Sequence, residues 1–597
     1  MKRIVLLLAM PGLSLAQVPG VGAPDGWADD PPAIDSLVEF ARNESSLRTA
    51  VVRYTQDIDA VQRRYPVPCS PARIARLRKL HEGWQQQLAT LNFAKLDREA
   101  QVDYVALRNR ITYYLDRLKL EELRAAQIKP LVPFFDDIRL MQEDRFDRKR
   151  VDPRAAAATL DKIARQAGEL AKDLKEPAAK GSIASRRQVS PGVAARAAAE
   201  VQDLREVLKD FHGYYDGYDP EYSWWARKPY ADADAALQAW ADAIRSELLG
   251  VKPGGKTPIL GDPVLADGLR ADLAVEMIPY GPQELIAIGE QEFKWIDEQL
   301  HTVSRRMGYG DDWKAALEHT KNLAPPPGEA PAAIFDIAHY SEDYIAKQHT
   351  ITLAPLAREI WRLAMQSPEK QLINPFFTGG ELTRLSYPTD SMSFEDRLMS
   401  LRGNTPHFNF PTVQHELVPG HHYQHFMEQR FNSHRDPLND TPFWTEGWAL
   451  YWEFQLWDHA DFPRNDPDRM GMLFWRAHRA ARIIFSLNYQ LGNWTPQQCV
   501  DFLVDRVGHE RANAEAEVRR ATQVAPLYQA AYMLGALQLR ALHKELVDSG
   551  RMSATQFHDA ILLGGPMPIE LVRARLAGGP IERDMKSSWR FYDSLKR

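Results

Sequence analysis

Apolar side chains recur every three or four residues along most of the chain, which is the period of an amphipathic helix. The pattern is clearest in the N-terminal half, over Arg98–Arg124, Ala155–Leu174 and Pro191–Phe211. Signals typical of strands are scarce, and the best candidates are two short segments, Gly379–Ser393 and His407–Phe410. The sequence therefore predicts a mainly α protein with a small β element.

Two segments rich in proline or glycine interrupt the helical pattern, Gly250–Asp262 and Leu323–Pro331. With the first of them as a boundary, we predict an N-terminal helical lobe over residues 17–250 and a C-terminal helical lobe over residues 251–597. The candidate catalytic side chains of the first lobe form no cluster in the sequence. We therefore expect the N-terminal lobe to shape access to a site that the C-terminal lobe forms.

The first residues have the pattern of a secretory signal peptide. Lys2 and Arg3 precede the mostly apolar stretch Ile4–Leu15, and a small-x-small cleavage sequence ends at Ala16. We expect residues 1–16 to be removed and the protein to be exported, to the periplasm or out of the cell. No later segment reaches the roughly 18 uninterrupted apolar residues that a membrane-spanning helix requires, so we expect no membrane span.

Charge and cysteine content restrict the partners and the metal chemistry. The chain has 74 Lys and Arg against 80 Asp and Glu, a formal net charge of −6. It lacks the basic surplus that phosphate binding needs, so no nucleic-acid partner is expected. Cys69 and Cys499 are the only two cysteines, too few for a cysteine-based zinc site. A bridge between them and two free thiols both remain open, as does the oligomeric state.

The most informative segment is Gln414–Gln424, with the sequence QHELVPGHHYQ. It opens like the zinc motif H-E-x-x-H, but Pro419 stands where the second histidine belongs. On a regular helix His421 would lie about 240° around the axis from His415, and His422 roughly 10 Å further along it. A proline followed by a glycine supplies a break in the helix. We therefore expect either His421 or His422 to join His415 at a metal.

A second segment, Phe443–Glu453, has the sequence FWTEGWALYWE and predicts an apolar helix that carries two acids. Burying a carboxylate among aromatic side chains is costly unless a cation compensates it. Glu446 is therefore the expected third ligand of a two-histidine, one-glutamate zinc site with an open fourth position. The alternative is that Glu446 caps its helix or pairs with an arginine. The tryptophans at helical spacing are expected in the core: Trp444, Trp448 and Trp452.

The motifs HELVPGHHYQ and TEGWALYWE resemble the bacterial domain-of-unknown-function family 885, a group of candidate zinc peptidases with an HExxPGHH signature. The resemblance covers at least Gly380–Leu546 and is most specific in these two segments. It implies a mainly helical, two-lobed gluzincin fold similar to thimet oligopeptidase and carboxypeptidase Taq, with an active-site cleft between the lobes. Alignment on its Gly-His pair favours His421 over His422 as the second ligand.

Together these features predict a secreted zinc metallopeptidase with one zinc ion per chain, bound by His415, His421 and Glu446. Glu416 would act as general base on a zinc-activated water that attacks the peptide carbonyl. The oxyanion needs a further donor, for which Tyr532 is the first candidate. The alternative donors are Tyr528 and His509.

Two other functions are consistent with the sequence. A zinc hydrolase of other amides or esters would use the same residues, and a non-catalytic exported binding protein would have a degenerate metal site. The metal content of the purified protein separates the non-catalytic binding protein from the two enzymes. A comparison of peptide and ester substrates separates the peptidase from the other hydrolase. A group of basic residues binds a substrate carboxylate in one interpretation and forms an ion-paired helix face in the other: Arg476, His478, Arg479 and Arg482.

Overall fold

The structure is a computed structural model that describes residues 23–175, 189–251, 258–326, 328–371, 376–439 and 441–596. Helices make up most of these residues, which confirms the mainly α prediction. The predicted signal peptide, residues 1–16, lies outside the described residues. No described helix is both long enough and apolar enough to cross a membrane.

The helices of the first half are α1(Ile34–Arg42), α2(Arg48–Arg64), α3(Pro71–Ala89), α4(Arg98–Ile128), α5(Phe135–Phe146), α6(Pro153–Lys175), α8(Pro191–Tyr215), α9(Pro220–Ala243), α10(Leu265–Val275) and α11(Pro282–Arg306). Those that follow are α12(Trp313–Lys321), α13(Ala330–Gln348), α14(Pro355–Ile360), α15(Pro368–Gln371), α16(Phe394–Gly403), α17(Pro406–Glu416), α18(His421–Glu428), α19(Pro442–Asp458), α20(Asp466–Gln490), α21(Pro496–Val507), α22(Arg511–Ala521), α23(Tyr528–His543), α24(Ala554–Gly564) and α25(Ile569–Leu576). Short 3-10 and π turns are η1(Phe93–Lys95), η2(Lys129–Leu131), η3(Ile244–Leu248), η4(Ser433–Arg435), η5(Lys544–Asp548) and η6(Phe591–Ser594).

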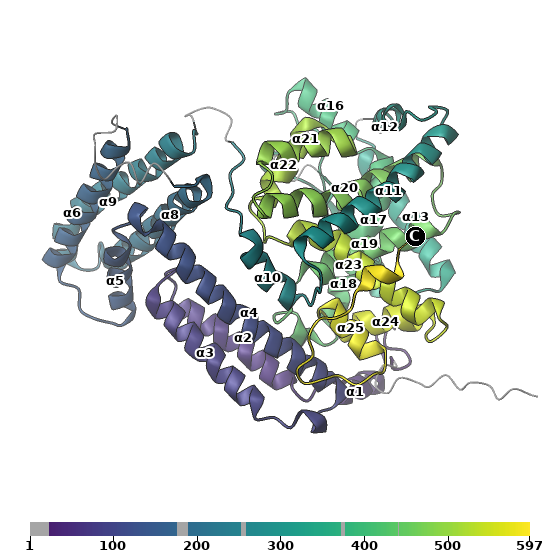
Figure 1. The fold of residues 1–597 in the computed structure, drawn as a ribbon, viewed down its shortest axis with the longest axis horizontal. Coiled ribbons are helices and arrows are strands. Elements are labelled where there is room, and N and C mark those ends of the chain that lie inside the picture. Colours follow the sequence, from purple (N-terminus) through teal and green to yellow (C-terminus); the bar gives the residue numbers. More distant parts are fainter. Residues whose placement is uncertain are drawn as a thin grey trace, which may run out of the picture.

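Three helical predictions are confirmed by α4, α6 and α8, each of which contains the predicted segment or all but its edges. Figure 1 shows their arrangement: α2, α3 and α4 lie alongside one another, and α5, α6, α8 and α9 gather at one end of α4. The helices from α10 onward form the larger body on the other side. The candidate metal ligands and catalytic residues predicted from the sequence lie in this larger body.

A two-stranded parallel sheet is the small β element, formed by β1(Arg362–Met365) and β2(Leu382–Leu385). β2 lies within the predicted segment Gly379–Ser393, so this prediction is confirmed. The other strand prediction, His407–Phe410, is wrong, because these residues form the first turns of α17. A short apolar run has no periodicity that separates a strand from a buried helix, and Pro406 at the helix start favours the helix.

The hydrophobic cores do not follow the order of the chain. One core joins side chains of residues 27–111 with side chains of residues 269–592. A second core lies within residues 128–244, where α6 packs against α9 and α5 against α8. The first helices thus pack with the C-terminal body, and the lobe boundary at residue 250 stays a prediction.

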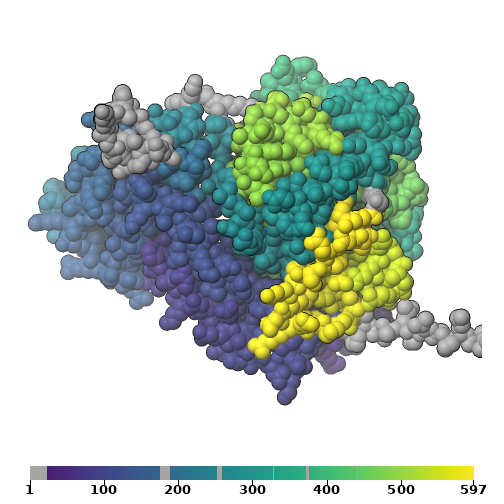
Figure 2. All heavy atoms as spheres, viewed as in Figure 1, coloured from purple at the N-terminus to yellow at the C-terminus, as the bar shows by residue number. Residues whose placement is uncertain are grey.

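A buried ion network holds α4 against the C-terminal body. Asp103 accepts a hydrogen bond from Arg435 Nε at 2.6 Å and contacts His434 Nε2 at 2.8 Å. Glu99 accepts from Arg575 Nε at 2.7 Å. Although burial alone would raise the pKa of Asp103, Arg435 and His434 lower it to about 2. Figure 2 shows the same association at the surface, where the C-terminal segment lies against the N-terminal helices.

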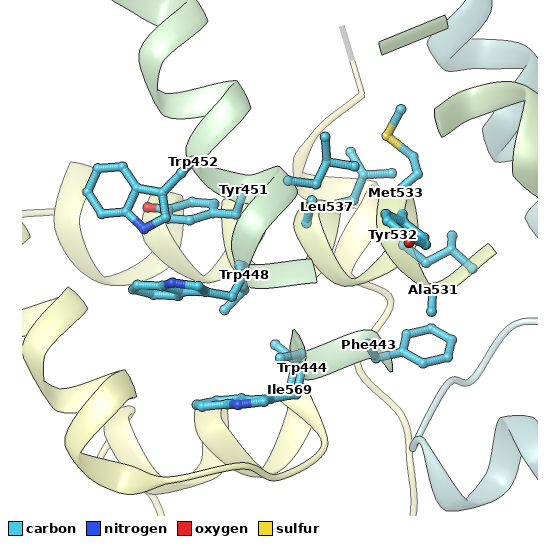
Figure 3. Packing of buried hydrophobic residues seen from close by; sticks show 14 of the residues in the cluster. Phe443, Trp444, Trp448, Tyr451, Trp452, Ala531, Tyr532, Met533, Leu537 and Ile569 are labelled. Atoms are coloured by element: carbon cyan, nitrogen blue, oxygen red, sulfur yellow. The ribbon is translucent and has the colours of Figure 1, made fainter. Parts of the chain in front are cut away.

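Helices α19 and α23 cross at two glycines. A methyl group on Gly447 would lie 2.7 Å from Gly535 Cα, and one on Gly535 would lie 2.2 Å from the carbonyl oxygen of Phe443. Aromatic side chains of α19 fill the space around this crossing (Figure 3). The predicted core tryptophans are all buried there: Trp444, Trp448 and Trp452. The two cysteines are free, Cys499 buried and Cys69 half-buried.

The close approach of the helices at these glycines predicts that two Gly-to-Ala substitutions will have different effects on the stability of the protein. Gly535→Ala should destabilise the protein by about 1–3 kcal/mol, because the two backbones must separate to admit the methyl group. Gly213→Ala is the matched control, since Gly213 lies in α8 with nothing within 4 Å of the added carbon. It should be neutral or stabilise by up to about 1 kcal/mol. Thermal unfolding followed by circular dichroism measures both; equal melting temperatures would contradict the close crossing.

Candidate functional site

A cavity of about 310 Å³ lies in the larger body, between α17, α18, α19, α20, α22 and α23. The loop before β2 forms another part of its wall through Phe376–Gly380. Its lining contains most of the site residues predicted from sequence: His415, Glu416, His421, Glu446, Tyr528 and Tyr532. The volume is at the lower end of the range for small-molecule sites.

The irregular histidine motif forms a helix, a turn and a second helix. The turn begins after Glu416, the last residue of α17, and Gly420 N donates to the Gln414 carbonyl at 3.0 Å. A methyl group on Gly420 would lie 1.9 Å from the carbonyl oxygen of His415, so the turn requires glycine. Trp448 Nε1 donates to the Pro419 carbonyl at 2.8 Å from α19. The predicted break in the helix is confirmed.

The turn brings three of the predicted metal ligands together. One ligand atom from each of His415, His421 and Glu446 lies within 4.8 Å of the others. Glu446 Oε2 lies 3.0 Å from His421 Nε2 and 3.5 Å from His415 Nε2. His422 is not part of this group, because its Nε2 donates to the carbonyl of Ala357 at 2.7 Å.

Buried polar partners fix the orientation and charge of these groups. His415 Nδ1 lies 2.8 Å from Glu453 Oε1, and Tyr528 donates to Glu446 Oε1 at 2.6 Å. Burial alone would raise the pKa of Glu446, but His421 and His415 hold it well below its usual range. Burial acts to lower the pKa of His415, yet Glu446 and Glu453 raise it to about 9. Each imidazole of the group therefore lies next to a carboxylate that stabilises its positive charge.

The two distances from Glu446 Oε2 to the imidazoles are compatible with a zinc ion. Two ligands at about 2.0–2.2 Å from a tetrahedral zinc ion lie roughly 3.3–3.6 Å apart. The two separations from Glu446 Oε2, 3.0 and 3.5 Å, lie close to this spacing. The donor set is two imidazoles and one carboxylate, which is typical of catalytic zinc sites with an open position. Glu453 on His415 is the outer-sphere carboxylate that such histidines commonly have.

Glu416 lies beside the three ligands on the cavity wall. The backbone of Gly379 passes close to it: a methyl group there would lie 2.1 Å from Glu416 Oε2 and 2.7 Å from its carbonyl oxygen. Only glycine allows the loop before β2 to approach this carboxylate. The small β element therefore positions a loop over the predicted general base.

The three candidate oxyanion donors have different environments. Tyr532 is buried and lines the cavity. Tyr528 is engaged with Glu446. His509 does not line this cavity and instead contacts His478 Nδ1 at 2.7 Å. Burial raises the pKa of Tyr532, so its phenol keeps the proton it would donate.

The basic residues of α20 support both interpretations, a helix face with ion pairs and a binding site for a substrate carboxylate. Arg476 pairs with Glu292 at 3.3 Å, and Arg482 with Glu517 at 2.6 Å, as an ion-paired face would. Arg479 and Arg482 nevertheless line the cavity. His478 is buried, and burial followed by the surrounding arginines lowers its pKa far below the usual value.

Two residues of the site were not assigned a role from sequence. Glu453 lies seven positions after Glu446, two turns of the same helix, and this spacing places both acids on one face. This spacing was therefore a signal in the sequence that could have identified Glu453. Arg520 of α22 also lines the cavity, but it stands far from both motifs in sequence, and no local pattern marks it.

Comparisons with known proteins define the family and the fold. Two solved structures are similar over most of the chain. A candidate lipoprotein of unknown function from Shewanella oneidensis has 14% identity and a TM-score of 0.60, covering 88% of this chain and 98% of that one. A candidate lipoprotein from Colwellia psychrerythraea has 15% identity and a TM-score of 0.53, covering 89% and 98%. At these identities the likeness is one of fold.

Comparison with curated proteins gave no match. The model of a family described as bacterial protein of unknown function (DUF885) matches residues 54–576. Since this range is most of the chain, the protein belongs to the DUF885 family.

Proposed function

We propose that this protein is a zinc-dependent metallopeptidase. The observation that carries the proposal is the convergence of His415, His421 and Glu446 within 4.8 Å on the wall of a cavity that Glu416 also lines. Two imidazoles and a carboxylate next to a second carboxylate are what hydrolysis of an amide by activated water requires.

Zinc would be held by His415, His421 and Glu446, and it would supply Lewis acidity toward a water molecule and a carbonyl oxygen. Glu416 accepts a proton from the attacking water and returns it to the leaving nitrogen. The Tyr532 hydroxyl donates to the oxygen that becomes negative in the transition state. Its ring lies nearly parallel to that of His415 with centroids 6.2 Å apart, so both groups face one region of the cavity.

We also propose that the protein acts outside the cytoplasm. The N-terminal sequence has the pattern of a signal peptide, and the two similar structures are of candidate lipoproteins. The division into an N-terminal lobe and a catalytic C-terminal lobe belongs to the same proposal. The described residues of α5, α6, α8 and α9 add nothing to the lining of the cavity. On this proposal the N-terminal lobe would therefore shape access to the site without forming part of it.

The first prediction concerns zinc content. The purified protein should bind about one zinc ion per chain, and His421→Ala or Glu446→Ala should lose most of it. His422→Ala is the matched control and should keep its zinc, because its imidazole is engaged with a backbone carbonyl. Elemental analysis after dialysis measures the stoichiometry. Full zinc occupancy in His421→Ala would remove this residue from the ligand set.

The second prediction separates metal binding from chemistry. Glu416→Gln preserves shape but removes the base, so it should keep zinc and fold while turnover falls at least ~100-fold. Glu395→Gln, an exposed acid of α16, should leave turnover unchanged. Rates on a peptide and on the matching ester test the substrate class. Wild-type turnover by Glu416→Gln would refute the base, and hydrolysis of esters alone would refute the peptidase.

The third prediction distinguishes the two tyrosines. Tyr532→Phe should lower kcat by ~10² or more with little change in KM or melting temperature, since its hydroxyl acts only in the transition state. Tyr528→Phe removes the hydrogen bond to Glu446 and should instead weaken zinc binding by about 10–100-fold. Steady-state kinetics and zinc titration of both variants give the comparison. An unchanged kcat in zinc-loaded Tyr532→Phe would return this residue to a packing role.

A further inference from the structure

Three arginines line the cavity around Tyr532. Arg479 and Arg482 come from α20, and Arg520 comes from α22. The guanidinium carbons of Arg479 and Arg482 lie 4.7 and 4.3 Å from the centre of the Tyr532 ring. The candidate zinc ligands line the same cavity, so any substrate that reaches them meets this positively charged side as well.

Acidic partners neutralise these arginines to different extents. Arg482 has a bidentate ion pair, because its Nε and Nη2 donate to the two carboxylate oxygens of Glu517 at 2.6 and 3.1 Å. Arg479 reaches Glu453 only at 3.5 Å, and that oxygen lies closer to His415, at 2.8 Å. Arg479 therefore shares a carboxylate that already has a partner.

Arg520 differs from the other two in how its charge is balanced. In the parts of the chain that the structure describes, no carboxylate oxygen lies within 4.0 Å of its guanidinium. Its Nη2 donates to Tyr528 Oη over a long 3.4 Å. Tyr532 raises the pKa of Arg520 most. Glu517, Tyr528 and Glu446 add to this against the effect of burial, so the group stays charged. A charged, half-buried guanidinium on the cavity wall can form charge-assisted hydrogen bonds with a bound anion.

We propose that Arg520, assisted by Arg479, binds the C-terminal carboxylate of a peptide, so that the protein removes residues from the C-terminal end of its substrates. This inference rests on the proposed peptidase function. A guanidinium matches a carboxylate with two parallel hydrogen bonds. The arginines and the candidate zinc ligands line one cavity of about 310 Å³, so the end of a single peptide could contact both. The carboxylate of an acidic side chain offers the same chemistry, and the test separates the two sources.

The test uses the full chain loaded with zinc and three blocked dipeptides. These are acetyl-phenylalanyl-leucine, its C-terminal amide, and acetyl-phenylalanyl-glutamic acid amide, whose only carboxylate is in the side chain. The wild type should favour the free acid by about 10-fold or more in kcat/KM, as loss of one charge-assisted contact implies. Arg520→Gln should remove this preference by raising KM for the free acid, Arg520→Lys should restore part of it, and zinc content should not change.

Two controls make the result specific. Arg511→Gln alters an exposed arginine of the same helix and should keep the wild-type preference. Binding of the three dipeptides to zinc-loaded Glu416→Gln, measured by calorimetry, gives a readout that does not need turnover. There the free acid should bind at least about 10-fold more tightly than its amide, and Arg520→Gln introduced into Glu416→Gln should abolish the difference.

The outcomes separate this inference from the proposed function. Equal kcat/KM for free acid and amide, or a preference unaffected by Arg520→Gln, overturns the role of Arg520. A preference for the side-chain carboxylate over the terminal one overturns action at the C-terminal end. Tight, Arg520-dependent binding of the free acid without hydrolysis of any peptide refutes the peptidase but supports the anion site. The absence of both binding and hydrolysis refutes both proposals.

Discussion

The turn between α17 and α18 is the feature on which the candidate site depends. A continuous helix would direct His415 and His421 about 240° apart around its axis, whereas the turn ends one helix after Glu416 and starts another at His421. Both imidazoles then reach the same carboxylate oxygen of Glu446. The backbone of Gly420 packs against the carbonyl of His415, where a side chain would overlap. The same stretch leaves Glu416 on the cavity wall.

The close crossing of α19 and α23 supplies the other half of the site. Glu446 directly precedes Gly447 in α19, and Gly535 lies one turn after Tyr532 in α23. The contact between the glycines therefore brings these two candidate site residues close together. Aromatic residues surround the crossing and exclude water. Carboxylates in such surroundings need compensation, which the histidines supply for Glu446 and Glu453.

Electrostatic compensation also divides the cavity into two sides. The side with the histidines has a carboxylate near every imidazole, while the side with the arginines has fewer close acids than basic groups. Tyr532 lies between them, next to His415 and under two guanidiniums. Under the proposed function, this asymmetry would orient a peptide with its reacting carbonyl toward the histidines and its negative charge toward α22.

The sequence by itself determined the helical class, the break in the histidine motif and the buried tryptophans of α19, because these follow from periodicity and from the backbone preferences of proline and glycine. It could not separate strand from helix at His407–Phe410, where the run is too short. Resemblance favoured His421, but only the tertiary structure engages His422 with Ala357. Likewise, only the tertiary structure places Gly379 beside Glu416 and Arg520 in the wall of the cavity. These contacts join residues distant in sequence, and their packing leaves no local pattern.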